Sequence, residues 1–198
     1  MSYHVQPYLV DLDRLHQVYG SHNTDLVAAI EWQQFEYYRY AIGEIAGLNY
    51  ELVEAGEPTI LTVHEALCRS VAGEMPAAHE YCSYGLALIL FCQQLGTRLP
   101  NDEFTFLAPA GVGFLEQAAP IAALLFHSSS PGPIAFPKDL GIGHFTWEQA
   151  AHQLATWQSI VVAEDPDDRA WEEEISAQYR GWLEEAVHTR RGIVTFFS

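Results

Sequence analysis

Two histidine–glutamate pairs carry the residues with the most chemistry in the chain. Each pair is followed by a cysteine, in the order His64-Glu65 with Cys68 and His79-Glu80 with Cys82. Residues three or four apart share one face of a helix, so each histidine would lie beside its cysteine. Imidazole nitrogen and thiolate sulfur are ligands of tetrahedral zinc sites. Two such helices facing each other would therefore assemble a His2Cys2 zinc site from His64, Cys68, His79 and Cys82.

This spacing matches no standard metal motif. Cys68 occupies the position at which a His-Glu-x-x-His sequence needs its second histidine. A simpler interpretation is that Cys68 and Cys82 are small core residues and that the histidines lie at the rim of the core. We therefore expect no bound metal and no other cofactor, and these four residues are the candidate ligands if a metal binds.

The same region holds the candidates for acid–base catalysis, because a carboxyl group buried beside an imidazole has a raised pKa and can transfer protons. The candidate catalytic residues are His64, Glu65, His79, Glu80 and Tyr84. Other glutamates also flank apolar segments, namely Glu44, Glu51, Glu74 and Glu116. Solvated surface carboxylates are the simpler interpretation, since carboxylates are rarely buried. Whether the protein is an enzyme stays open, and we favour a protein without catalytic activity.

Nucleophilic and nucleotide sites have weaker support in the sequence. The chain contains no Gly-x-Ser-x-Gly motif, and a thiolate pair of Cys82 with His79 would need an orientation that neighbours on one helix rarely adopt. Gly111-Val112-Gly113 opens a predicted helix, but Glu116 stands where the dinucleotide fingerprint needs its third glycine. A carboxylate at that position would repel a pyrophosphate.

The elements around these residues predict a mainly α-helical protein in which residues 1–198 form a single globular domain. We expect six or seven helices and a small β-ribbon of the two terminal strands, Tyr3–Val10 and Ile193–Phe197, with Pro7 favouring a sheet edge. The helices are expected within residues 11–19, 24–42, 58–72, 77–95, 112–126, 147–161 and 165–191. The signal over 43–58 is mixed, with room for a short helical turn at Glu51–Ala55. The segment 99–113 is predicted to be a loop that could hold a short extended piece at Phe104–Leu107, and a Ser-Pro loop is predicted at 128–133.

The helix predicted at residues 77–95 is apolar on nearly every face, which is typical of the middle of a helical bundle. Its apolar run is too short for a membrane span, which needs about 20 residues. The chain has three cysteines, a small and odd number, whereas a secreted disulfide framework needs several complete pairs. The N-terminal residues do not resemble a signal peptide, so we expect a cytoplasmic protein.

The charge balance limits the partners. The chain has 26 acidic and 9 basic residues, a formal net charge of -17, and its single lysine is Lys138. Phosphate and anionic lipid both require clustered cations, so we expect no binding to nucleic acid or to membranes. An acidic surface accelerates association with a basic protein, and that is the partner class we favour.

Aromatic residues add a second indication of an interaction surface. The chain has 5 Trp, 10 Tyr and 10 Phe, and Trp147, Trp157, Trp171 and Trp182 follow the buried stripes of predicted helices. Trp32, Tyr37, Tyr38 and Tyr40 are harder to bury together and could line a groove or a contact between copies. The leading hypothesis is an acidic cytoplasmic protein-interaction module, similar to an inhibitor or immunity protein. The alternatives are a small-molecule-binding protein or enzyme with a His/Glu-lined pocket near residues 64–84, and a homodimer subunit without a site of its own.

Four stretches together resemble an uncharacterised bacterial family, a domain of unknown function. They are SYHVQPYLVDLDRL, AHEYCSYGLALILFCQQLGTRLPNDEF, FPKDLGIGHFTWEQ and GWLEEAVHTRRGIVTFFS. The resemblance covers most of the chain and implies a single bacterial domain. It implies no activity and transfers no functional residues.

Overall fold

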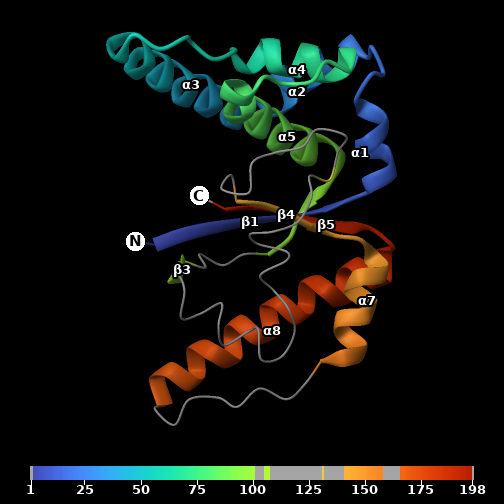
Figure 1. Cartoon of the computed structure of the whole chain (residues 1–198). Coiled ribbons are helices and arrows are strands. Elements are labelled where there is room, and N and C mark those ends of the chain that lie inside the picture. The colour runs from blue at the N-terminus through green and yellow to red at the C-terminus, as the bar shows by residue number, and fades with distance from the viewer. Residues whose placement is uncertain (1, 101–104, 108–130, 132–140, 158–165, 198) are drawn as a thin grey trace.

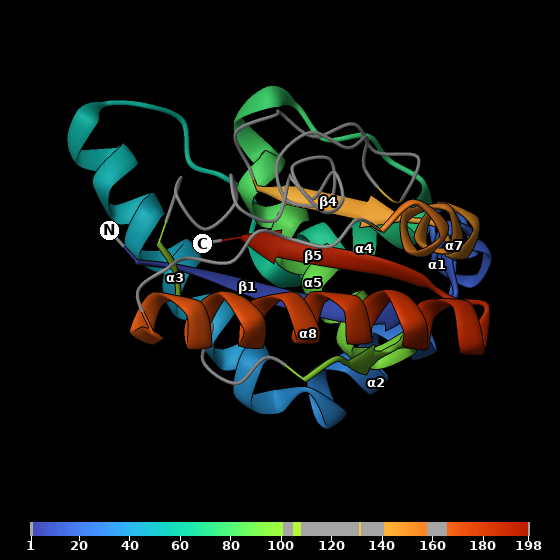
Figure 2. The same cartoon turned by 90° about the horizontal axis from the view of Figure 1, so that it is seen from below.

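A central antiparallel sheet separates two layers of helices in the computed structural model, which describes residues 2–100, 105–107, 131, 141–157 and 166–197 (Figure 1). The strands lie in the order β2-β1-β5-β4, and β3 also pairs with β1. Their bounds are β1 Ser2–Val10, β2 Thr97–Arg98, β3 Thr105–Leu107, β4 Ile142–Phe145 and β5 Gly192–Phe197. Seen from below, α8 (Pro166–Thr189) runs across the face of the sheet (Figure 2).

The two terminal strands pair with each other, as predicted. β1 and β5 are antiparallel over six residue pairs, from Val5 opposite Phe197 to Val10 opposite Gly192. The expected edge position of β1 is wrong, because β2 and β3 pair along its other side. Pro7 has no N–H to donate, and it lies between the residues that pair with β3 and those that pair with β2.

Alternation along β1 gives each helical layer its own apolar face of the sheet. Tyr8 and Val10 belong to the hydrophobic cluster under the upper layer, and Val5 and Leu9 belong to the cluster under α8. Successive side chains of a strand point to opposite faces, so one strand contributes to both clusters. The sheet is therefore buried on both sides and positions the helices of both layers.

The upper layer is built around α5 (Tyr81–Leu95), the central helix expected from the sequence. Leu88, Leu90 and Phe91 are fully buried on different faces of this helix. The helices around it are α1 Leu12–Val18, α2 Thr24–Gln33, α3 Phe35–Ala55 and α4 Val63–Ala72, with a 3-10 turn, η1, at Ala78–Glu80.

The helix predicted at 24–42 is two helices. The chain turns at Gln34, and α3 then continues through Gly43 and Gly47 to Ala55, across a segment in which the sequence signal is mixed. Glycine costs about 1 kcal/mol in a helix interior, and burial of Ala41 and Ile45 on the opposite face outweighs that cost. Gly56 ends α3 in a left-handed conformation with φ 75°.

The lower layer contains α7 (Trp147–Thr156) and α8, the two helices predicted from tryptophan stripes. Tyr179 and Trp182 of α8 are buried against the sheet, and the indole N–H of Trp182 donates to the carbonyl oxygen of Pro100 at 2.8 Å. Strand β4 is not among the predicted strands, because its four residues are too short a pattern to indicate a strand. The predicted helix at 112–126 and the Ser-Pro loop lie outside the described residues.

The fold is mainly α-helical, as expected. The described part of the chain contains seven α-helices, and the predicted terminal ribbon is extended to a larger sheet by β2, β3 and β4.

Candidate functional site

His64 connects three helices of the upper layer. Its Nδ1 lies 2.6 Å from Oε1 of Glu31 on α2, and the hydroxyl of Tyr38 on α3 donates to the same oxygen at 2.8 Å. A carboxylate can only accept hydrogen bonds, so this contact requires a proton on Nδ1. In the neutral form of the ring, Nε2 is then the acceptor. Burial raises the pKa of the Glu31 carboxyl, but the bonds from His64 and Tyr38 outweigh it and the net pKa is lowered.

Cys68 lies on the free side of that imidazole. Its Sγ is 3.5 Å from Nε2 of His64, one helical turn earlier on α4. The thiol is half-buried, whereas the His64 side chain is 55% exposed and therefore accessible to solvent. Burial and the negative charge of Glu31 raise the pKa of the Cys68 thiol. The resting arrangement is therefore a neutral thiol beside a proton acceptor that a carboxylate orients.

Sequence analysis placed His64 beside Cys68 but missed Glu31 and Tyr38. Glu31 is 33 residues from His64 in the chain, and only the packing of α2 against α4 brings them together. Glu31 and Tyr38 are seven residues apart, a spacing that repeats on a helix face, but the helix break at Gln34 separates them. No local sequence signal indicates this group.

Glu65 forms part of a helix cap. Its Oε2 accepts the backbone N–H of Thr62 at 2.8 Å, and the Thr62 hydroxyl accepts the backbone N–H of Glu65 at 3.2 Å. This reciprocal pair satisfies free N–H groups at the start of α4. The bonds from the backbone and hydroxyl of Thr62 hold the pKa of the Glu65 carboxyl below its usual range.

Glu80 forms a second group with Arg69. The Glu80 side chain is buried, accepts the backbone N–H of Ala77 at 2.8 Å, and lies 3.4 Å from a guanidinium nitrogen of Arg69. The adjacent His79 is exposed. Tyr84 is buried and donates to the carbonyl oxygen of Glu74 at 3.3 Å. Burial, followed by the charge of Glu80, raises the pKa of Tyr84 to about 12.

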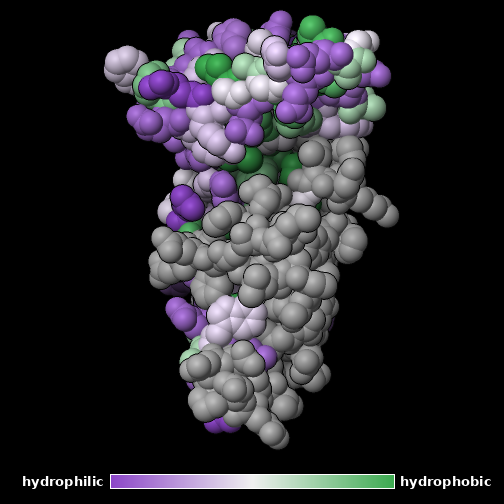
Figure 3. All heavy atoms as spheres, turned by 90° about the vertical axis from the view of Figure 1, so that its left-hand side faces the viewer, coloured by the Kyte–Doolittle hydropathy of each residue, from purple (hydrophilic) through white to green (hydrophobic). Residues whose placement is uncertain are grey.

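The structure does not bring the candidate catalytic residues together: His64 lies with Cys68 and Glu31, whereas Glu80 lies with Arg69. Of the others, Glu65 serves as a helix cap, His79 lies exposed, and Tyr84 bonds to backbone. Within the described ranges, no three or more His, Cys, Asp or Glu side chains are arranged to hold a metal ion. Cys82 contributes to a different feature, an apolar cavity of about 430 Å³ between α3, α5 and the sheet that Ile89 and Phe196 also line. Figure 3 shows green, apolar atoms recessed below the hydrophilic surface of the upper helices.

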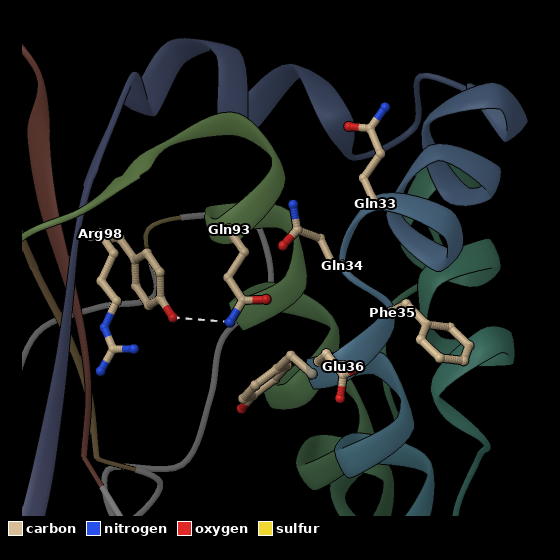
Figure 4. Close-up of a pocket in the computed structure, with 8 residues that line it drawn as sticks. Gln33, Gln34, Phe35, Glu36, Gln93 and Arg98 are labelled. Atoms are coloured by element: carbon tan, nitrogen blue, oxygen red, sulfur yellow. Dashed lines mark hydrogen bonds between the residues drawn. The ribbon is translucent and has the colours of Figure 1, made fainter.

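A second cavity, of about 390 Å³, lies where α2 and α3 meet α5 and β2, and both polar and aromatic side chains line it. Figure 4 shows Arg98, Gln93 and Glu36 around it, with Gln93 bonded to the Tyr8 hydroxyl at 3.1 Å. The amide oxygen of the same side chain, Gln93 Oε1, is buried without a hydrogen-bond partner in the described part of the chain. Burial raises the pKa of the Tyr8 hydroxyl, and the Gln93 bond and the Arg98 charge oppose this increase.

An exposed apolar face covers α2 and α3. Of the eight large hydrophobic side chains that are exposed among the described residues, seven lie on these two helices and the eighth is Met75. We define the α2–α3 face as Trp32, Phe35, Ile42, Tyr50 and Val53. Its α3 members recur at helical spacing on one side of α3. Trp32 is 85% exposed, and a cavity of about 560 Å³ lies beside it and Phe35. Of the four aromatic residues predicted to be hard to bury together, Trp32 and Tyr40 are exposed, and Tyr37 and Tyr38 are partly buried.

The two helices that carry this face are strongly acidic. Residues 24–55 contain six carboxylates, Asp25, Glu31, Glu36, Glu44, Glu51 and Glu54, against the single basic residue Arg39. The Arg39 guanidinium is 5.5 Å from the centre of the Phe35 ring, so the one cation lies against the apolar surface.

Comparison with known proteins gives a family and no activity. A family model described as Domain of unknown function (DUF7691) matches residues 1–198. No curated protein and no solved structure matches the chain. Among the described residues, none of the helices combines the length and apolarity that crossing a bilayer would require.

Proposed function

Because the chain belongs to the DUF7691 family, a domain of unknown function, its role has to be derived from its own geometry, and we propose that it is an acidic protein-interaction module. The α2–α3 face binds a basic protein, in the manner of an inhibitor or immunity protein and without a catalytic activity of its own. We propose that the protein works in the bacterial cytoplasm, because its three cysteines are free thiols and a reducing compartment keeps thiols free.

The concentration of exposed apolar side chains on α2 and α3 carries this proposal. Scattered surface hydrophobics are ordinary, but a contiguous patch marks an interaction site. Trp32, Phe35 and Tyr50 are of residue types that dominate binding energy, because rigid aromatics bury large areas at a low cost in side-chain entropy.

The acidic composition of α2 and α3 favours a basic partner. Six carboxylates and one arginine give this helical pair a negative field, and a basic surface is complementary to it. A second copy of the chain would instead bring two strongly negative molecules together.

The proposal is tested by capture and reconstitution. The tagged protein is incubated with lysate of its source organism, and a retained protein is purified and titrated against the wild type and a Trp32→Ala, Tyr50→Ala variant. We expect the variant to weaken binding at least about 30-fold, since each anchor contributes 1 kcal/mol or more. Raising NaCl from 50 to 300 mM should weaken wild-type binding, because salt screens the attraction.

Met75→Ala is the matched control, since Met75 is exposed to 58% and lies outside the α2–α3 face. It should bind like the wild type. The proposal is wrong if the double variant keeps the wild-type affinity or if binding is insensitive to salt. Sedimentation of the protein alone tests the homodimer alternative. A dimer that forms as the concentration rises, and that the double variant does not form, would favour that alternative.

A second candidate is a small-molecule-binding protein, and the unpartnered Gln93 Oε1 is the observation that favours it. A buried acceptor without a partner costs about 1–3 kcal/mol, which a ligand carrying an N–H or O–H group would recover. Arg98 would bind an anionic group of the same ligand. This pocket differs from the one predicted near residues 64–84. A thermal-shift screen of small zwitterions against wild type and Gln93→Leu tests whether the pocket binds such a ligand.

A further inference from the structure

Three helices place a carboxylate, an imidazole and a thiol in one hydrogen-bonded series. Glu31 lies 2.6 Å from Nδ1 of His64, and Nε2 of the same ring lies 3.5 Å from Sγ of Cys68. The carboxylate and the thiol are on opposite nitrogens, which is the arrangement that lets a histidine act as an oriented base. We propose that Cys68 is a nucleophilic thiol that exchanges with small disulfides, and that His64 accepts its proton.

The reaction is a thiol–disulfide exchange. The Cys68 S–H proton passes to Nε2 of His64, and the Glu31 carboxylate stabilises the resulting imidazolium. The Cys68 thiolate attacks one sulfur of a disulfide R–S–S–R. A new S–S bond joins Cys68 Sγ to that sulfur, and the S–S bond of the substrate breaks, so that the second sulfur leaves as the thiolate R–S⁻. The leaving thiolate takes the proton from His64 and departs as R–SH. The disulfide is the oxidant, and the product is a mixed disulfide on Cys68.

The geometry favours a disulfide over an acyl group as the electrophile. Acyl transfer builds an oxyanion that needs aimed hydrogen-bond donors, whereas disulfide exchange spreads its charge over three sulfur atoms. The Glu31 charge beside the thiol and the net charge of -17 favour a cationic disulfide over an anionic one. Low-molecular-weight diamine disulfides are therefore the proposed substrate class.

The chain supplies an internal comparison for this proposal. Cys82 has the same half-buried class as Cys68, and burial with a nearby carboxylate, Glu44, raises its pKa in the same way. Its contacts in the described residues include no histidine. Cys92 is fully buried. Cys82 is the more deeply buried of the two, so the decisive comparison is between wild type and His64→Gln, which removes the base next to Cys68.

The experiment measures modification of each cysteine separately. The full-length protein is incubated with cystamine, quenched with acid at successive times, digested and quantified by mass spectrometry. We expect Cys68 to react at least about 10-fold faster than Cys82 at pH 7.5, since base catalysis contributes about 100-fold or more. His64→Gln should reduce the Cys68 rate to that of Cys82, and Glu31→Gln and Tyr38→Phe should give intermediate rates. The anionic probe dithiodiglycolate should react more slowly than cystamine in the wild type.

The pH dependence separates a base from a structural role for His64. In the wild type, acidification should lower the Cys68 rate, because a protonated imidazole cannot accept the thiol proton. The other titratable groups facing the ring are Glu31, Tyr38 and Glu65. In His64→Gln this dependence disappears and the rate rises only with ionisation of the thiol. The exposed His64 can be replaced without unfolding, which the melting temperature verifies. Equal rates at Cys68 and Cys82, or an unchanged profile in His64→Gln, would overturn the proposal.

Discussion

Glutamates in similar sequence settings perform different tasks in this protein. Glu65 and Glu80 each follow a histidine, yet both accept backbone N–H groups at the start of a helical segment. Glu31 follows no such pattern and is the carboxylate that contacts an imidazole. The difference arises from position along the helix, because a glutamate at the third residue of a helix can fold back onto the cap, whereas one near its end projects toward neighbouring helices.

Thr62→Ala removes the cap of α4, and we expect the free energy of unfolding at pH 7 to fall by about 1 kcal/mol. The Glu65 pKa is lower in the folded than in the unfolded state, so its contribution is present above the unfolded value of about 4.3 and is lost as pH falls through the folded value. The cost of Thr62→Ala should therefore shrink below about pH 4.3, as measured by urea denaturation.

Thr146→Ala is the matched control for that measurement. Thr146 caps α7 in the same reciprocal arrangement, but its partner is Gln149, which does not titrate. Thr146→Ala should lower the free energy of unfolding by a similar amount, and this loss should not depend on pH. Thr62→Ala keeps the backbone N–H of residue 62, so the pH dependence reports on the bond from the Thr62 hydroxyl to Glu65. A pH-independent cost of Thr62→Ala would mean that this hydroxyl does not help to lower the Glu65 pKa.

At the scale of elements, α3 is the helix that local sequence rules describe least well. Gly43 and Gly47 lie on its open side, where a Cβ added to either would meet nothing within 4 Å. The helix persists because Ala41 and Ile45 are buried on the opposite side. The backbone freedom of the two glycines is thus a cost that the packing of α3 overcomes.

Gly43→Ala and Gly47→Ala should each raise the free energy of unfolding by about 0.5–1 kcal/mol, because alanine has the higher helix propensity and has space here. Gly96→Ala should lower it, because a Cβ at Gly96 would lie 2.7 Å from the carbonyl oxygen of Leu9 and 2.8 Å from Cγ2 of Val10. Urea denaturation of the three variants tests both signs. Destabilisation by Gly43→Ala would show that this side of α3 is not open.

Elements with a strong local signal could be predicted from the sequence, and those fixed by packing could not. The terminal strands are rich in β-branched and aromatic residues, α5 is apolar on nearly every face, and tryptophans mark one face of α7 and α8. The extent of α3 and the existence of β4 depend on contacts distant in the chain. The same limit applies to the candidate site, where His64 and Cys68 share a turn of one helix but Glu31 and Tyr38 come from two others.

At the scale of the whole molecule, one sheet contributes to the hydrophobic clusters of both helical layers, and the chain carries a large excess of negative charge. Ile193 of β5 packs into the lower cluster, while Val194 packs into the upper one, so the closing strand joins both layers. The ion pairs between described residues are few and mostly exposed, as with Arg180 and Glu184, and such pairs contribute about 0–1 kcal/mol each. Stability therefore depends on the two hydrophobic clusters, and the charge of -17 acts against the folded state by self-repulsion.

This balance predicts that salt stabilises the protein near neutral pH. Raising NaCl from 10 to 150 mM shortens the screening length from about 30 to 8 Å, which weakens repulsion among carboxylates more than it weakens the few ion pairs. We expect a higher melting temperature by calorimetry at pH 7, where each 1 kcal/mol corresponds to about 2–4 °C for a chain of this size. At pH 5, near the isoelectric point of about 4.7, the net charge is small and the increase should nearly vanish. A melting temperature that falls with salt at pH 7 would mean that attractive charge pairs, and not self-repulsion, dominate the electrostatics of the fold.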